Sequence, residues 1–107
     1  MIELSEDTRY FGIVRNAKPE GLGLIVGKDF IESGTYHCGM LNGKSRRLVF
    51  KDYYYKGNTH LGILSGKGVK FCAKEKKKIS GIFEYNIIAK VEQEEGLDIN
   101  SLSTFFL

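Results

Sequence analysis

Stretches in which bulky residues alternate with small or polar ones recur four times along the chain. They begin at Tyr10, Tyr36, Thr59 and Phe83, and each keeps the alternation over five positions. A period of two places successive side chains on opposite faces of a strand, whereas a helix would repeat every 3.6 residues. We therefore predict four half-buried strands. Their first positions, and the positions four residues further on, should share one buried face.

Each predicted strand leads into a turn and a second strand. The residue pairs at the turn positions are Asn16-Ala17, Asn42-Gly43, Ser65-Gly66 and Ala89-Lys90. Asn-Gly between two strand-like runs favours a type I′ turn, because both central residues of that turn need positive φ. Second apolar runs follow at 22–26, 48–50 and 69–71. The pattern predicts an all-β fold, an antiparallel meander of repeated β-hairpins.

The hairpins recur with a nearly constant length. Gly34, Gly57 and Gly81 open similar stretches at spacings of 23 and 24 residues, and an earlier copy begins at Thr8. Self-similarity at a period of 20–50 residues is typical of stacked repeats, which are stable together although one hairpin alone is marginal. The sequence thus predicts a repeat sheet over residues 1–90, with copies near 8–33, 34–56, 57–80 and 81–90.

The first copy resembles the MORN repeat, whose consensus is Tyr-x-Gly-x-(Trp/Phe)-x-Asn-Gly followed by Gly-x-Gly. The matching positions of this copy are Tyr10, Gly12, Asn16, Gly21 and Gly23. The second copy keeps Tyr36, Asn42 and Gly43, the third keeps Gly66, and the fourth is the weakest match. The resemblance implies a twisted single sheet of hairpins that serves as a scaffold, a dimerisation element or a membrane-association element, without catalytic machinery.

Residues 91–107 differ from the repeats in composition. An acidic stretch that we expect to be a linker is followed by an apolar segment containing Leu102, Phe105 and Phe106. Such apolar side chains are costly to leave in water, so the segment is expected either to cap the last hairpin or to bind a partner as a tail.

Composition narrows the class of protein. The chain has 13 glycines and one proline among 107 residues, but no Gly-X-Y period, which excludes collagen. No run approaches 18 apolar residues, so a membrane-spanning helix is not expected. The acidic start does not resemble a signal peptide, and two cysteines without a secretion signal favour a reducing, cytoplasmic location.

Positive charge is concentrated in the middle of the chain. Residues 44–78 carry eleven basic and two acidic side chains, whereas 91–107 carry four acidic side chains and no basic one. Repetition should stack the basic residues in columns along one side of the sheet. The candidate contacts to an anion or partner are Lys44, Arg46, Arg47, Lys51, Lys67, Lys70, Lys74, Lys76, Lys77 and Lys78. A solvated face, an acidic protein or anionic membrane surface, and nucleic acid stacked on Tyr53, Tyr54 and Tyr55 are the alternatives.

Candidates for chemistry are few. His37 and His60 occupy the same position of successive copies, about 9–10 Å apart, which is long for two ligands of one zinc ion. No carboxylate matches their register, and Cys38 and Cys72 are expected to be buried free thiols. We therefore predict no metal, no cofactor, no catalytic residue and no small-molecule substrate.

The sequence favours a non-catalytic protein–protein interaction or scaffold module that is a small subunit of a larger assembly. A protein partner is expected, and a free sheet edge makes a homodimer a further expectation. The alternative is an anion-binding module that uses segment 44–78 for nucleic acid or acidic lipid head groups.

Overall fold

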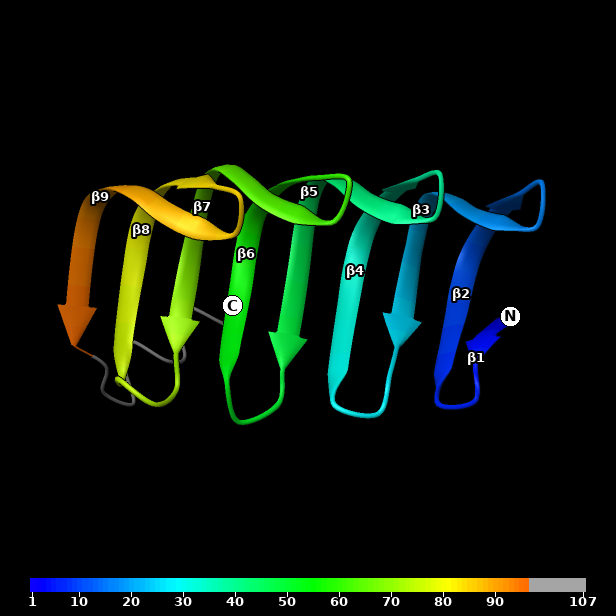
Figure 1. Ribbon diagram of the computed structural model, residues 1–107, viewed down its shortest axis with the longest axis horizontal. Helices are drawn as coiled ribbons and strands as arrows, with labels where there is room; N and C mark the ends of the chain where they lie inside the picture. Colours follow the sequence, from blue (N-terminus) through cyan, green and yellow to red (C-terminus); the bar gives the residue numbers. More distant parts are fainter. Residues whose placement is uncertain (97–107) are drawn as a thin grey trace.

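The fold is an antiparallel sheet, seen here in a computed structural model that describes residues 1–96. Nine strands lie side by side in chain order (Figure 1). They are β1 (Ile2–Ser5), β2 (Thr8–Arg15), β3 (Lys18–Val26), β4 (Phe30–His37), β5 (Met40–Val49), β6 (Tyr53–His60), β7 (Ile63–Cys72), β8 (Lys77–Glu84) and β9 (Ile87–Gly96). The predicted all-β meander of hairpins is confirmed.

Four tight turns join the strands at one end of the sheet. Their central residues are 16–17, 38–39, 61–62 and 85–86, and the first residue of each has φ between 47° and 52°. The turn at Asn16 is where we predicted it. The other three lie four residues before the predicted pairs, and Asn42-Gly43 instead lies inside β5.

This offset has a simple cause. In the predicted alignment of the repeats, Tyr36 matches Tyr10. In the sheet, however, Gly34 is the residue equivalent to Gly12, because both pair with Gly23, on opposite sides of β3. Copies two to four are therefore shifted by four residues relative to the predicted frame.

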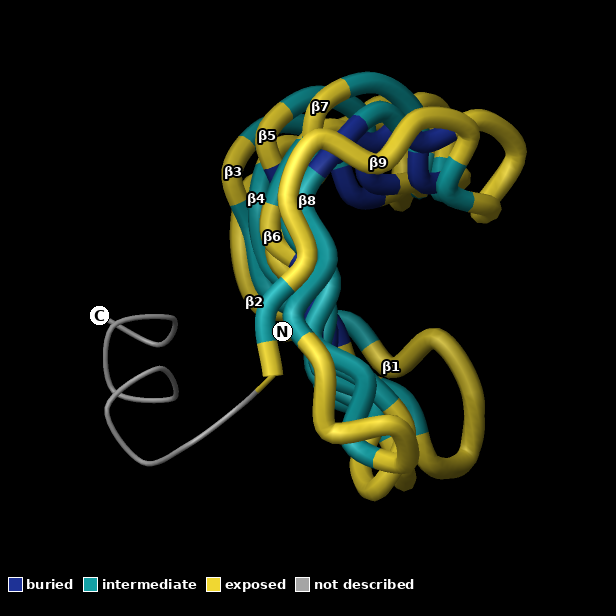
Figure 2. Tube along the Cα trace, turned by 90° about the vertical axis from the view of Figure 1, so that its left-hand side faces the viewer, coloured by how far each residue is buried: buried dark blue, intermediate teal, exposed yellow. Residues whose placement is uncertain are grey.

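A row of small residues crosses the sheet from β2 to β8. It consists of Gly12, Gly23, Gly34, Ser45, Gly57, Gly68 and Gly81, each paired with the next. At Gly12, with φ of 149°, a methyl group would lie 2.6 Å from the carbonyl oxygen of Leu22. Each of the four hairpins has a register shift beside this row, and β-bulges bend strands. The strands therefore curve into a hook, as Figure 2 shows.

The core lies on the concave side of the hook. Tyr10 packs edge-to-face against Tyr36 with ring centroids 5.3 Å apart, and Tyr55 packs in the same way against Phe83 at 5.2 Å. All four rings are almost fully buried, and Thr59 is buried as well. The first positions of the predicted strands therefore share one buried side, as expected.

The positions four residues further on do not share that side. Met40 and Ile63 are 45% and 36% exposed, whereas Leu41 and Leu64, one residue later, are buried in their place. Leu41 is the residue that pairs with Tyr36. The prediction that Met40 and Ile63 point inward is wrong because the turns precede them.

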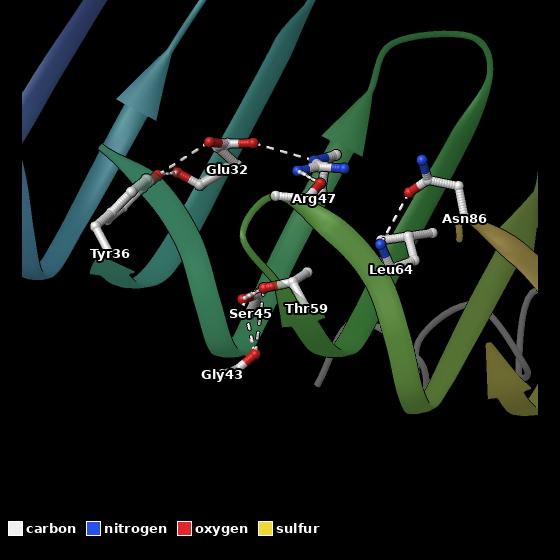
Figure 3. A network of polar contacts seen from close by, with 9 residues as sticks. Glu32, Tyr36, Gly43, Ser45, Arg47, Thr59, Leu64 and Asn86 are labelled. Carbon is white, nitrogen blue, oxygen red and sulfur yellow. Dashed lines mark hydrogen bonds and ion pairs between the residues drawn. The ribbon is translucent and has the colours of Figure 1, made fainter. Parts of the chain in front are cut away.

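Polar groups inside the hook are paired with one another (Figure 3). The Arg47 guanidinium contacts the Glu32 carboxylate at 3.0 Å, and the Tyr36 hydroxyl donates to the Glu32 carbonyl. Burial acts to lower the pKa of Arg47, but the charge of Glu32 and the hydrogen bonds and charge interactions with Tyr53 and Glu32 together outweigh it and leave this pKa raised. Ser45 and Thr59 share a hydroxyl–hydroxyl bond of 2.8 Å.

The C-terminal part of the chain departs from our expectation. Residues 91–96, expected to be a linker, form the second half of β9, an edge strand of the sheet. The predicted cap or tail with Leu102, Phe105 and Phe106 lies outside the described residues. No helix that is long and apolar enough to cross a membrane occurs in residues 1–96.

Candidate functional site

A groove of about 730 Å³ crosses the strands on the side of the sheet opposite the core. It runs from β4 to β9, and its floor is the backbone of the glycine row. The side chains that line it are Ser33, Lys44, Arg46, Lys56, Asn58, Lys67, Val69, Ser80 and Glu92.

The bend of the strands explains the groove. Paired residues of neighbouring strands point to the same face, and successive residues of one strand point to opposite faces. Ser45 is buried on the concave side, so its neighbours Lys44 and Arg46 stand on the convex side. Where a strand bends away from its convex face, the side chains before and after the bend splay apart. The two convex rows thus separate and leave the backbone between them open.

The groove is strongly basic. Lys44, Arg46, Lys56 and Lys67 are all exposed, and none of them takes part in an ion pair with another residue of segment 1–96. Arg46 and Lys56 are directly opposite each other in the β5–β6 pair. Like charges in that position destabilise a sheet. Glu92 is the single acidic residue in the lining.

We predicted that basic residues at matching positions of the copies stack along one side of the sheet. This is correct for Lys44 with Lys67, but wrong for Arg47 with Lys70. Lys44 and Lys67 lie together along the groove, as expected from their matching positions. Arg47 and Lys70 instead share the concave face, because both pair with Tyr55. An offset of three residues from Lys44 to Arg47 reverses the face of a strand, so the columns cannot lie on one side of the sheet.

The remaining predicted contacts lie away from the groove. Lys51, Lys74 and Lys76 are exposed in the connections at the end of the sheet opposite the tight turns. Lys77 begins β8 and pairs with Glu94 at 3.0 Å, and this hydrogen bond and charge raise the pKa of Lys77. Lys78 follows Lys77 along β8.

Sequence reasoning did not select Lys56, although it stands in the middle of the groove. In the first strand of each hairpin, the residue before the glycine of the row is Phe11, Ser33, Lys56 or Ser80. Lys56 therefore has no counterpart in the other copies, and a search for repeated charges passes over it. Knowledge of the β5–β6 register was needed to place it opposite Arg46.

The three consecutive tyrosines are structural. Tyr55 is fully buried, and its hydroxyl donates to the carbonyl of Asn58 at 2.7 Å. Tyr54 is 8% exposed on the other face of β6. Tyr53 is half-buried with the Lys70 ammonium 4.6 Å from its ring centre. Buried rings cannot serve as stacking platforms for bases.

The histidine and cysteine positions also differ from expectation. Cys38 is exposed in the β4–β5 turn, not buried, and Cys72 is half-buried, which raises the pKa of its thiol. Glu20 reaches His37 with a carboxylate oxygen 3.0 Å from Nδ1. The premise that no carboxylate lies in register with the histidines is therefore wrong for His37.

No protein-family model matches the chain, and no curated protein sequence is significantly similar to it.

Proposed function

We propose that this chain is a non-catalytic protein–protein interaction module that holds an acidic segment of a partner in the basic groove. The observation that carries this proposal is the groove itself, in which four exposed cations surround a floor of open backbone. Their mutual repulsion lowers the stability of the free sheet, and an acidic partner would relieve it.

The dimensions of the groove suit an extended peptide. Five strand spacings separate β4 from β9, which is roughly 24 Å at about 4.8 Å per strand. A segment of about seven extended residues spans that length at about 3.3 Å per residue. The aliphatic stems of the lysines and Val69 give apolar contact, while the charged ends select acidic side chains.

Two features favour a peptide over single-stranded nucleic acid. Binding of single strands uses exposed aromatic rings between the cations. Tyr54 and Tyr55 are buried, and the side chains that line the groove include no aromatic ring.

Acidic lipid head groups are the second candidate, and they point to a different place on the sheet. Lys51, Lys74 and Lys76 are exposed in neighbouring connections at one end of the strands. An anionic membrane surface attracts such a cluster at about 1 kcal/mol per cation. The groove and this cluster can be tested separately because they share no residue.

We also propose the relationship to MORN repeats in a revised frame. With Gly57 in the place of Gly12, the third copy reads Tyr55-x-Gly57, then Leu61-Gly62, then Gly66-x-Gly68. Tyr10 and Tyr55 then play the same part, since each hydroxyl donates to the carbonyl three residues later, at 2.6 and 2.7 Å. Glu32 and Ile79 occupy that position in the second and fourth copies.

The test is a binding titration by fluorescence anisotropy with a labelled peptide of alternating glutamate and serine, about seven residues long. The groove variant replaces Lys44, Lys56 and Lys67 by glutamate. Its matched control replaces Lys18, Lys51 and Lys74 by glutamate, so that both variants have the same net charge.

We expect the groove variant to bind at least about tenfold more weakly than the control, because close charge pairs are each worth 1 kcal/mol or more at an interface. An equal loss of peptide affinity in both variants would show that the peptide responds only to the net charge of the protein, and would reject the groove as its binding site. Binding to vesicles that contain anionic lipid tests the second candidate function, the recognition of acidic lipid head groups. That function requires that the control variant, and not the groove variant, loses its affinity for the vesicles.

A further inference from the structure

A second cluster of reactive side chains lies at the tight-turn end of β3 and β4, away from the residues that line the basic groove. Glu20 faces His37 across the strands, and the two side chains meet at 3.0 Å. Cys38 follows in the turn, and its backbone N–H donates to the other Glu20 carboxylate oxygen at 2.9 Å. One oxygen, one nitrogen and one sulfur ligand atom lie within 4.8 Å of one another.

We propose that Glu20, His37 and Cys38 bind one zinc-class divalent transition-metal ion, with water as the fourth ligand. Imidazole nitrogen, thiolate sulfur and carboxylate oxygen are the three donor types that zinc takes in proteins. Calcium and magnesium prefer oxygen ligands alone, so they are not expected here. This revises our expectation from the sequence that the chain has no metal site.

The geometry needs only small movements of side chains. Zinc lies about 2.0–2.3 Å from its ligands, so in a tetrahedral site the ligand atoms are roughly 3.3–3.8 Å apart. The Glu20 oxygen and His37 Nδ1 are already 3.0 Å apart, so only the longest of the three separations, at most 4.8 Å, must shorten by about 1 Å. The His37 side chain is 56% exposed and Cys38 is exposed in its turn, which leaves both side chains room to rotate.

Metal binding requires that the Glu20 carboxyl and the Cys38 thiol are both deprotonated. The Cys38 N–H and the His37 ring both hold the pKa of the Glu20 carboxyl below its usual range. The Cys38 thiol must lose its proton to the solvent when its sulfur binds the ion, and the affinity should rise with pH. Arg15 is close enough to act on Glu20 and opposes the cation.

The next hairpin supplies a natural control. Asn42 takes the place of Glu20, and its side-chain oxygen accepts a bond from Leu61 N–H at 3.1 Å, as Glu20 does from Cys38. His60 ends β6 as His37 ends β4. The same turn arrangement therefore occurs twice. The first turn has the Glu20 carboxylate and the Cys38 thiol, and the second has the Asn42 amide and the Leu61 side chain in their places. A hydrogen bond to the turn accounts for a side-chain oxygen at this position, but not for the histidine, carboxylate and cysteine together.

Cobalt(II) and zinc(II) titrations of the full chain under reducing conditions test the site. We expect one equivalent of cobalt to give the ligand-field bands of a tetrahedral ion and a thiolate charge-transfer band, both removed by zinc. His37→Gln and Cys38→Ser should each weaken zinc binding at least about tenfold in competition with a chromophoric chelator. His60→Gln and Cys72→Ser should leave it within about twofold.

The absence of stoichiometric binding would overturn the proposal. So would equal losses in the His37→Gln and His60→Gln variants, or a thiolate band that survives Cys38→Ser and disappears in Cys72→Ser. Circular dichroism of each variant establishes that its sheet is intact. None of these residues lines the basic groove, so peptide binding by the groove is an independent readout.

Discussion

Replacing Lys56 by glutamate is expected to stabilise the free protein while it weakens the binding of an acidic segment. Lys56 is directly opposite Arg46 in the β5–β6 pair, and both side chains are exposed. Opposed residues have Cβ atoms about 4.5–5.5 Å apart, and like charges there destabilise a sheet. The substitution turns this repulsion into an attraction.

The size of the gain follows from Coulomb's law. Two unit charges about 6 Å apart in water interact with roughly 0.7 kcal/mol, and physiological salt screens about half of that. Removing the repulsion and adding the attraction should therefore stabilise the sheet by about 0.5–1 kcal/mol. For a domain of this size Tm should rise by roughly 2–6 °C.

Thermal unfolding followed by circular dichroism measures this gain, and high salt should reduce it. A double-mutant cycle with Arg46→Gln isolates the pair, since the gain from Lys56→Glu should be clearly smaller in that background, where only the repulsion from the other groove lysines is relieved. A Lys56→Glu variant that is less stable than the wild type, or that gains as much without Arg46, would refute the reasoning. Peptide affinity should fall in the same variant.

Three further predictions concern the interior of the hook. Tyr55→Phe removes the hydrogen bond of the hydroxyl group and should lower the free energy of unfolding by about 0.5–1.5 kcal/mol. Burial raises the pKa of Tyr55 from 10.0 to about 12, so the stability of the wild type declines over that pH range. Unfolding curves at alkaline pH should show a smaller decline for the variant. Gly57→Ala should cost about 3 kcal/mol or more in urea denaturation, because φ is 158° and its methyl group would lie 2.6 Å from a carbonyl oxygen, whereas Gly96→Ala has open space and should be near neutral. Arg47→Met leaves the Glu32 carboxylate buried without its partner and should lose about 2–4 kcal/mol, most of which replacing both residues by apolar ones should restore.

Alternation and period were sufficient to predict the class of fold. Alternation and period did not predict the positions of the later turns correctly. Tyr36 aligns with Tyr10 in the sequence, although the two tyrosines lie at different positions of their hairpins. Cys38, Leu61 and Tyr85 carry positive φ in the turns, and these residue types do not signal it. The Asn-Gly signal at 42 falls within β5 because the preceding hairpin has already turned.

The two candidate sites were harder to predict because both depend on pairing between neighbouring strands. The groove appears only when the glycines of separate strands line up and the sheet bends at that row. Glu20 meets His37 through the register of β3 with β4. A sequence pattern read along the chain records neither the register nor the bend.

Residue-resolved NMR is the most direct measurement of the groove as a binding surface. The isotope-labelled chain is titrated with the acidic peptide at physiological salt, and the amide shifts are followed. We expect saturable changes in the amide shifts of residues that line the groove, namely Lys44, Lys56, Asn58, Lys67 and Ser80. The amide shifts of the loop lysines should not change. Changes centred on the loops 50–52 and 73–76, or spread evenly over all exposed lysines, would contradict it.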